Sequence, residues 1–247
     1  THSDQEKHPN QKPKPPPNPN PTNTNNRYET NPALGSGMGS RGRYASLKRR
    51  ILNDFVVKPG LSVLDVGCGD LVVVKDLSFA SYSGMDVSES AIANGRALRP
   101  EWTFHLGSTQ DVDPAKADVV LCFDVLIHQP TLEEARALLA FLSKHARRRI
   151  IITGYDAPIR GHHIVYFHAP LKALLEELDG WKAPVKIASY HNMSVYVMDR
   201  ANTEDDPFIP AFSLLLPAQQ RPIVTITVNT FNNKNQIGRC LESIKRQ

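Results

Sequence analysis

Two carboxylates and two glycines are spaced as in a binding site for an adenosine-containing molecule. Asp65, Gly67 and Gly69 lie in the stretch VLDVGCGD, and Asp86 follows about 20 residues later, in YSGMDVSESAI. Glycine permits a sharp backbone turn and leaves room for a ligand close to the backbone. An acidic side chain at this spacing can accept hydrogen bonds from both hydroxyls of a ribose. The pattern therefore predicts a nucleoside-type cofactor site.

These residues need buried strands to position them. The apolar side chains of residues 61–66 are typical of a buried parallel strand, and a second apolar stretch ends in Asp86. Open α/β sheets bind their ligands at the carboxyl ends of the strands, so we expect Asp65 near that edge. A dinucleotide fingerprint would place a third glycine at position 72, which is Val72. Close helix–strand packing beneath a pyrophosphate is therefore not encoded.

A second group of side chains that could take part in catalysis lies at and after the end of the stretch ADVVLCFD. Residues 119–123 predict a buried strand, and Asp124 and His128 come just past its carboxyl end. Histidine, with an ordinary pKa of about 6.5, suits a general base; the alternative for His128 is a helix-entry residue bonded to nearby backbone. Asp124 could orient His128, contact an acceptor or bind a metal. No His/Cys cluster supports the metal, because the adjacent His162 and His163 cannot easily share one site.

The ordered set of Asp-x-Gly-x-Gly, the later Asp86 and the later strand ends resembles the class I S-adenosylmethionine-dependent methyltransferases. The loop GSGMGS, a short helix over residues 44–55 and then VLDVGCGD look like a bacterial subgroup of that family, over roughly residues 27–160. The resemblance implies S-adenosylmethionine as the cofactor. It also implies that the segment 27–56 forms a mobile lid, in which Arg41 or Arg43 meets a carboxylate or an anionic acceptor. A solvated basic helix face is the alternative for these arginines and for Lys48.

The resemblance assigns roles to individual residues. Gly67 and Gly69 allow the close backbone approach, Asp86 binds the ribose, and Asp65 organises the turn and, through water, the methionine amine. Ser108 and Thr109 are candidates for the adenine edge, and Phe123 either packs on the adenosine or belongs to the core. The full cofactor-binding prediction is Asp65, Gly67, Cys68, Gly69, Asp86, Val87, Ser108, Thr109, Phe123 and Arg41, and the catalytic prediction is His128 and Asp124.

The remaining pattern predicts an α/β fold with a Rossmann-like, seven-stranded, mostly parallel sheet, a C-terminal antiparallel hairpin and helices on both faces. Helices are expected over residues 70–80, where three consecutive valines are awkward, over 89–98 with Ser88 as cap, and over 131–144. Arg147–Arg149 are expected to close the last of these against its dipole. Further predicted elements are a strand over 150–155, a helix between Pro170 and Gly180, and a hairpin of residues 185–190 and 194–198.

The composition changes along the chain. Residues 1–26 are rich in proline and polar residues and predict a disordered tail, and residues 27–200 form the predicted methyltransferase domain. Residues 201–221 are expected to be a linker. Residues 222–247 resemble the opening strand, turn and helix of a family 2 glycosyltransferase, which implies a truncated start of such a domain.

The predicted function is methyl transfer to an oxygen of a sugar or surface glycan, and this acceptor class rests on the glycosyltransferase-like segment alone. Alternatives are an RNA or protein methyltransferase and a non-catalytic cofactor-binding module of a larger glycosyltransferase. The formal charge of +4 is small for 247 residues and does not by itself argue for nucleic acid, so we expect no nucleic-acid partner. The expected partners are a small-molecule or glycan acceptor and a fused glycosyltransferase domain. No bilayer-spanning run is present, and three scattered cysteines indicate reduced thiols in a cytoplasmic protein.

Overall fold

The computed structural model describes residues 35–56, 60–156, 169–190 and 192–202. All of them belong to the first of two compact units, Thr1–Ile209 and Pro210–Gln247. The predicted tail over 1–26 and the glycosyltransferase-like segment over 222–247 lie outside the described residues, as does the predicted linker beyond residue 202.

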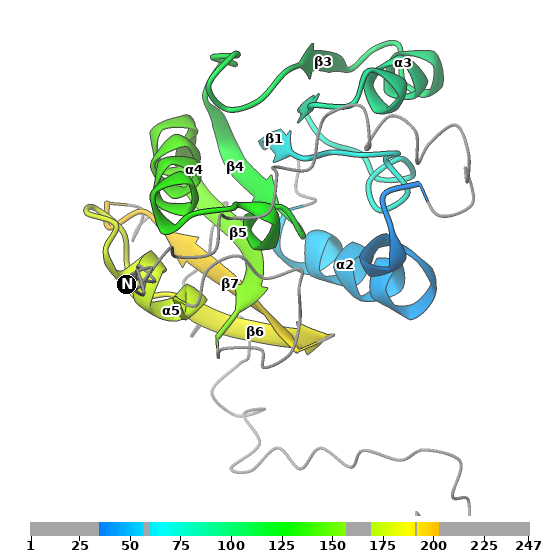
Figure 1. Cartoon of the computed structure of the whole chain (residues 1–247). Helices are drawn as coiled ribbons and strands as arrows, with labels where there is room; N and C mark the ends of the chain where they lie inside the picture. Colours follow the sequence, from blue (N-terminus) through cyan, green and yellow to red (C-terminus); the bar gives the residue numbers. More distant parts are fainter. Residues whose placement is uncertain (1–34, 57–59, 157–168, 191, 203–247) are drawn as a thin grey trace, which may run out of the picture. The chain divides into compact units, whose positions relative to one another are not determined.

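A seven-stranded sheet forms the centre of the described region, as predicted (Figure 1). Its order is β3-β2-β1-β4-β5-β7-β6, in which β7 runs antiparallel to both β5 and β6 and the other pairs are parallel. The strands are β1 (Ser62–Val66), β2 (Ser81–Asp86), β3 (Thr103–Leu106), β4 (Ala117–Cys122), β5 (Ala146–Tyr155), β6 (Val185–Tyr190) and β7 (Met193–Asp199). In β6 the register shifts between Lys186 and Ala188, so that Ile187 is an extra residue opposite β7.

Two apolar cores cover the two faces of this sheet. Side chains of α4 (Leu132–His145) and α5 (Leu171–Glu176) pack in one core, while α2 (Gly42–Phe55) and α3 (Glu89–Leu98) contribute to the other. Figure 1 shows α4 and α2 on opposite sides of the central strands. Every residue of β4 is buried, as a central parallel strand between two helix layers requires.

Local capping explains why two helices begin where they do. The Ser88 side chain accepts a hydrogen bond from the backbone N–H of Ala91 at the start of α3. The Thr131 hydroxyl accepts one from the N–H of Glu134 at the start of α4. Both caps satisfy N–H groups that have no partner within the helix, and both were predicted. Two short 3₁₀ helices, η1 (Met38–Ser40) and η2 (Leu126–His128), flank the carboxyl edge of the sheet.

The predicted helix over residues 70–80 is wrong. The chain between β1 and β2 forms turns over residues 72–76, and Leu71 adopts a positive φ of 59°. Val72, Val73 and Val74 are β-branched and lose side-chain freedom in a helix, so the local preference against helix prevails here.

The predicted role of Arg147–Arg149 at the end of a helix is also wrong, because all three residues lie in β5. The Arg149 side chain is buried, and its guanidinium donates to both carboxylate oxygens of Asp199 on β7, at 2.6 and 2.8 Å. It also donates to the Phe55 carbonyl at the end of α2. A buried arginine therefore links the sheet to the N-terminal helix.

Candidate functional site

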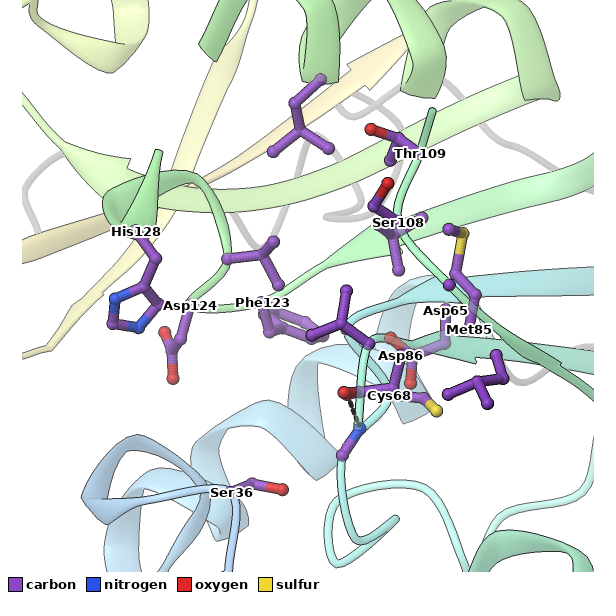
Figure 2. A pocket seen from close by; sticks show the side chains of 18 of the residues that line it. Ser36, Asp65, Cys68, Met85, Asp86, Ser108, Thr109, Phe123, Asp124 and His128 are labelled. Carbon is purple, nitrogen blue, oxygen red and sulfur yellow. Dashed lines mark hydrogen bonds between the residues drawn. The ribbon is translucent and has the colours of Figure 1, made fainter. Parts of the chain in front are cut away.

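A cavity of about 770 Å³ opens at the carboxyl ends of β1, β2 and β4. Figure 2 shows its labelled side chains, with Asp65, Cys68 and Asp86 on one side and Phe123, Asp124 and His128 on the other. The lining includes these predicted residues: Asp65, Gly67, Cys68, Gly69, Asp86, Val87, Ser108, Thr109, Phe123, Asp124 and His128. The structure thus brings together, from four separate stretches of sequence, every predicted site residue except Arg41.

The glycine turn after β1 is built so that no side chain fits at its first position. Gly67 has φ 77°, and a Cβ placed on it would lie 2.2 Å from Cγ2 of Val125. The N–H groups of Gly67 and Cys68 both donate to the Met85 carbonyl on β2, at 2.9 and 3.0 Å. The backbone is therefore fixed against the neighbouring strand and open toward the cavity, as a cofactor cradle requires.

Cys68, between the two glycines, is buried. Burial, followed by the nearby Asp65 and Asp86 carboxylates, raises the pKa of its thiol well above the ordinary value. The thiol therefore stays protonated, and the residue contributes to the turn by packing rather than as a nucleophile.

Asp86 fixes the second half of the cradle. One carboxylate oxygen accepts from the N–H of Gly69 and the other from the N–H of Ser88, each at 2.9 Å. Burial raises the pKa of Asp86, although these backbone donors oppose the shift. Each oxygen keeps a further acceptor position, so the residue fits the ribose role while it ties the glycine turn to the start of α3.

Asp65 lies beneath the turn and is buried. Its Oδ2 accepts a hydrogen bond of 2.7 Å from the hydroxyl of Tyr82 on β2. Burial raises the pKa of Asp65 to about 6; the Tyr82 hydrogen bond and the charge of Lys48 oppose this rise, and the Asp86 charge adds to it. The hydrogen bond therefore links β1 to β2 beneath the turn, and the role of Asp65 in organising the turn stays a prediction.

This shifted pKa predicts a pH-dependent stability that Asp65→Asn should remove. An acid whose pKa rises from 3.8 to about 6 on folding contributes stability that is complete below pH ~4 and is lost as the pH rises through ~6. A shift of this size corresponds to roughly 3 kcal/mol. The Asn carbonyl still accepts from Tyr82. In urea unfolding, the free energy of unfolding of the variant, relative to that of the natural chain, should therefore rise between pH ~4 and ~7. A difference that does not change with pH would contradict this assignment.

The proposed adenine side of the cavity consists of the loop after β3. Ser108 donates to the Asp111 carboxylate from its N–H, at 2.9 Å, and from its hydroxyl, at 2.6 Å. Val87 and Leu106, at the ends of β2 and β3, line the same part of the cavity although each side chain is about two-fifths exposed, at 43% and 44%. Two exposed apolar side chains beside short polar ones suit the two faces and the edge of an aromatic base.

Arg41 is not among the residues that line the cavity. Instead, its guanidinium forms an ion pair with Asp70, the residue that follows the second glycine. Asp70 also accepts from the N–H and hydroxyl of Ser36, and its own N–H donates to that hydroxyl at 2.9 Å. Although burial opposes the change, these contacts lower the pKa of Asp70. Gly35, Ser36 and Ser40 line the cavity, so the N-terminal segment is clasped to the glycine turn.

Asp124 and His128 lie on the remaining wall. Asp124 has φ 60° and accepts hydrogen bonds from Lys48, Tyr190 and Thr153. His128 is the last residue of η2, and its backbone N–H donates to the Val125 carbonyl at 3.0 Å. Its side chain is exposed toward the cavity. The structure therefore places both predicted catalytic residues beside the cofactor cradle.

Sequence reasoning missed several residues that hold this site. Tyr82, Asp70 and Ser36 act on the cradle, and Lys48 and Tyr190 act on Asp124. A signal existed for Lys48, which shares one face of its helix with Ala45, Ile51 and Leu52, all buried. The others depend on contacts between residues distant in sequence, which a sequence pattern does not encode.

Within the described ranges, no group of three or more His, Cys, Asp or Glu side chains could hold a metal ion. The same residues include no helix with the length and apolarity needed to cross a membrane.

Comparisons with known proteins agree with this geometry. Residues 63–148 match the family model described as a methyltransferase domain. A curated relative, the magnesium-protoporphyrin O-methyltransferase of Synechocystis sp. (strain ATCC 27184 / PCC 6803 / Kazusa), is 37% identical over 103 residues, which cover 38% of this chain and 44% of that enzyme. The chain thus matches less than half the length of this relative.

Solved structures show the same fold. The magnesium protoporphyrin IX methyltransferase from Synechocystis PCC 6803, with S-adenosylhomocysteine bound, superposes with a TM-score of 0.51 at 24% identity over 63% of this chain and 81% of that one. The N-methyltransferase NodS from Bradyrhizobium japonicum WM9, in complex with S-adenosylhomocysteine, gives a TM-score of 0.57 at 13% identity over 72% of this chain and 99% of that one.

None of these similarities is to a glycosyltransferase, and the predicted start of such a domain at residues 222–247 gains no support from them. The seven-stranded sheet with its antiparallel C-terminal hairpin is the Rossmann-like fold of the methyltransferases. The family match over residues 63–148, the shared fold and the cradle after β1 make this part of the chain similar to methyltransferases, in agreement with the resemblance that its sequence shows.

Proposed function

We propose that this chain transfers the methyl group of S-adenosylmethionine to a hydroxyl oxygen of a sugar or glycan. The observation that carries methyl transfer is one continuous cavity, which is lined by the cradle residues Gly67, Gly69 and Asp86 and, on its other wall, by His128. A donor held by the first group therefore lies in the same space as a side chain able to accept a proton.

When bound, the cofactor would supply a methyl group on a sulfonium; an acceptor oxygen would attack that carbon in line, so that the carbon–oxygen bond forms as the carbon–sulfur bond breaks and S-adenosylhomocysteine leaves. The protein holds the two reactants in this geometry, an orientation effect that can lower the barrier by about 7–11 kcal/mol. Gly67 and Gly69 allow the close approach of the backbone, and Asp86 accepts from the ribose. The clasp of Ser36 and Arg41 on Asp70 closes the N-terminal segment over the turn and limits the access of water.

An attacking hydroxyl must lose its proton, and His128 is the candidate to receive it. Its side chain is exposed at the cavity wall, at the end of a short helix that begins just past β4. General-base catalysis by a positioned imidazole is worth about 10²–10⁴ in rate.

His128→Ala should therefore lower kcat by about 10²-fold or more while the affinity for S-adenosylhomocysteine stays within a few-fold. Turnover and calorimetric binding measured on the same preparation separate these two effects. His105→Ala is the matched control, because His105 lies on β3, bonded to Ser83, and does not line the cavity. Unchanged turnover in the His128 variant would exclude this residue from the mechanism.

Two observations support an oxygen acceptor on a saccharide. The relative with 37% identity is an O-methyltransferase, and the sequence at residues 222–247 resembles the start of a sugar-transferring domain. The first supports oxygen as the atom that receives the methyl group, and the second supports only a saccharide as the acceptor class.

The acceptor class can be tested with methyl-labelled S-adenosylmethionine. Purified chain is incubated separately with sugar nucleotides and oligosaccharides, with total RNA and with total protein. We expect label in the saccharide fraction that survives mild alkali, because a methyl ether resists base and a methyl ester does not. Label in RNA or protein alone would contradict the proposal. Cofactor binding without transfer to any fraction would favour a non-catalytic module.

The RNA and protein alternative depended on a basic face of α2, and the structure weakens it. Lys48 is buried, Arg41 pairs with Asp70, and Arg49 donates to the Val72 carbonyl at 2.7 Å. Among the basic residues of the described helix, Arg43 and Arg50 are the exposed ones. Two exposed arginines provide few cations for contacts with the phosphates of a polyanion.

A further inference from the structure

Lys48 is the feature of this site that the proposed chemistry leaves unexplained. Its side chain is 0% exposed, although lysine is almost never fully buried without a partner. Its Nζ lies 2.6 Å from Oδ2 of Asp124 and 5.2 Å from the ring centroids of both Phe123 and Tyr190. The cation is therefore enclosed by one carboxylate and two aromatic faces, an arrangement that offsets the loss of hydration.

The other oxygen of Asp124 is engaged as well. Oδ1 accepts from the Tyr190 hydroxyl at 2.5 Å and from the Thr153 hydroxyl at 3.2 Å, and the Thr153 oxygen accepts from the Asp124 N–H at 2.8 Å. Burial and the Asp124 charge raise the pKa of Tyr190 far above its usual range, so its hydroxyl remains a donor. Asp124 therefore receives donors from three elements, α2, β5 and β6.

The same carboxylate also meets the N-terminal segment. A Cβ placed on Gly39 would lie 2.1 Å from Asp124 Oδ2, so the backbone of η1 closes directly on this oxygen. Asp124 itself follows β4 with a positive φ, a conformation that aspartate tolerates better than most non-glycine residues but that still costs free energy. The neighbouring residues Phe123 and His128 belong to the same loop and line the cavity.

We propose that Lys48 is a positioning residue for the acceptor side of the cavity. Together with Tyr190 and Thr153 it fixes the position of Asp124. The docking of α2 and the ordering of residues 123–130 are therefore coupled, so that neither occurs without the other. This inference rests on the proposed function for its effect on turnover, but not for the coupling itself. Asp124 then serves as an anchor whose oxygens are occupied, and His128 is left as the group that meets the acceptor's proton.

The coupling is tested by hydrogen exchange on the chain without cofactor, which does not depend on the acceptor. Lys48→Met keeps the length of the side chain and removes its charge, and should accelerate exchange about tenfold in both α2 and residues 123–130. Lys144→Met is the matched control, since Lys144 pairs with Asp113 at the same 2.6 Å but is exposed and is not part of the cavity lining. This control should leave the hydrogen-exchange rates of both α2 and residues 123–130 unchanged.

Tyr190→Phe is the second variant, because it removes one hydroxyl while the ring keeps its packing against Tyr44, 5.6 Å away. It should loosen the same two segments to a smaller extent. Tyr196→Phe, whose hydroxyl bonds Asp156 outside the cavity lining, is its control. Since contacting residues in one network are not additive, Lys48→Met with Tyr190→Phe should loosen the segments no more than Lys48→Met alone.

Methyl transfer supplies the second readout, measured with the acceptor that the labelling experiment identifies. Lys48→Met should lower kcat about tenfold and Tyr190→Phe to a smaller extent, while the affinity for S-adenosylhomocysteine stays within about threefold in both, because the cradle residues are untouched. Loosening of α2 alone, of residues 123–130 alone, or of neither would overturn the coupling. Coupled loosening with normal kcat would overturn the positioning role, and absence of any methyl transfer with coupled loosening would count against the proposed function only.

Discussion

Asp86→Asn is expected to lower the affinity for S-adenosylmethionine and S-adenosylhomocysteine about 100-fold, equivalent to about 2.8 kcal/mol. The carboxylate accepts from the N–H groups of both Gly69 and Ser88, and is also the proposed partner of the ribose. An amide has one acceptor oxygen in place of two, so one of the two backbone N–H groups would face an NH₂ donor. Both the glycine turn and the ribose contact would therefore be weakened together.

Isothermal calorimetry with S-adenosylhomocysteine measures this effect directly. Asp76→Asn provides the control for the change of charge, because Asp76 lies in the same connection between β1 and β2 but is exposed and does not line the cavity. Its affinity should equal that of the natural chain. An Asp86 variant that binds within threefold of the natural chain would contradict the assigned cradle.

Gly67→Ala is expected to abolish measurable cofactor binding and to lower the free energy of unfolding by about 2–5 kcal/mol. Two separate costs add at this position. The φ of 77° is unfavourable for any residue with a side chain, and the new Cβ would lie 2.2 Å from Val125 Cγ2. The turn or the Val125 loop must then move, and both line the cavity.

A second glycine separates these two costs. Gly60 has φ 89°, and a Cβ placed on it meets no atom of the described residues within 4 Å, so Gly60→Ala carries the backbone cost alone. Denaturant unfolding should show a loss of about 1–2 kcal/mol for this control, with normal cofactor affinity. Adding Val125→Ala to Gly67→Ala should recover the steric part only. Equal losses at Gly60 and Gly67 would show that the contact with Val125 has no energetic consequence.

Much of the architecture could be predicted from local patterns. Runs of branched apolar residues indicate the buried strands. The capping hydroxyls of Ser88 and Thr131 indicate where two helices begin. Strand ends then locate the site, because parallel strands share one carboxyl edge. For this reason the sequence predicted both the cradle around Gly67 and the opposite wall at His128.

What could not be predicted depends on partners distant in sequence. Lys48 looks like part of a solvated basic face until Asp124 and Tyr190 are placed beside it by the sheet. From the sequence, Arg149 was predicted to be a cation at a helix end; in the fold it pairs with Asp199 of the antiparallel strand β7. Arg41 was expected to contact the ligand, but it forms an ion pair with Asp70 instead. In each case a charge is paired only in the folded chain, and its role follows from the pairing.

The extra residue in β6 has a consequence for association between molecules. In the described part of the chain β6 ends the sheet on one side, and β3, only four residues long, ends it on the other. An exposed strand edge is a template for intermolecular β-pairing, and a bulge or a very short strand spoils that template. The irregular position at Ile187 increases the local twist and breaks the ladder of free peptide groups. Both borders of the sheet thus discourage aggregation by strand addition.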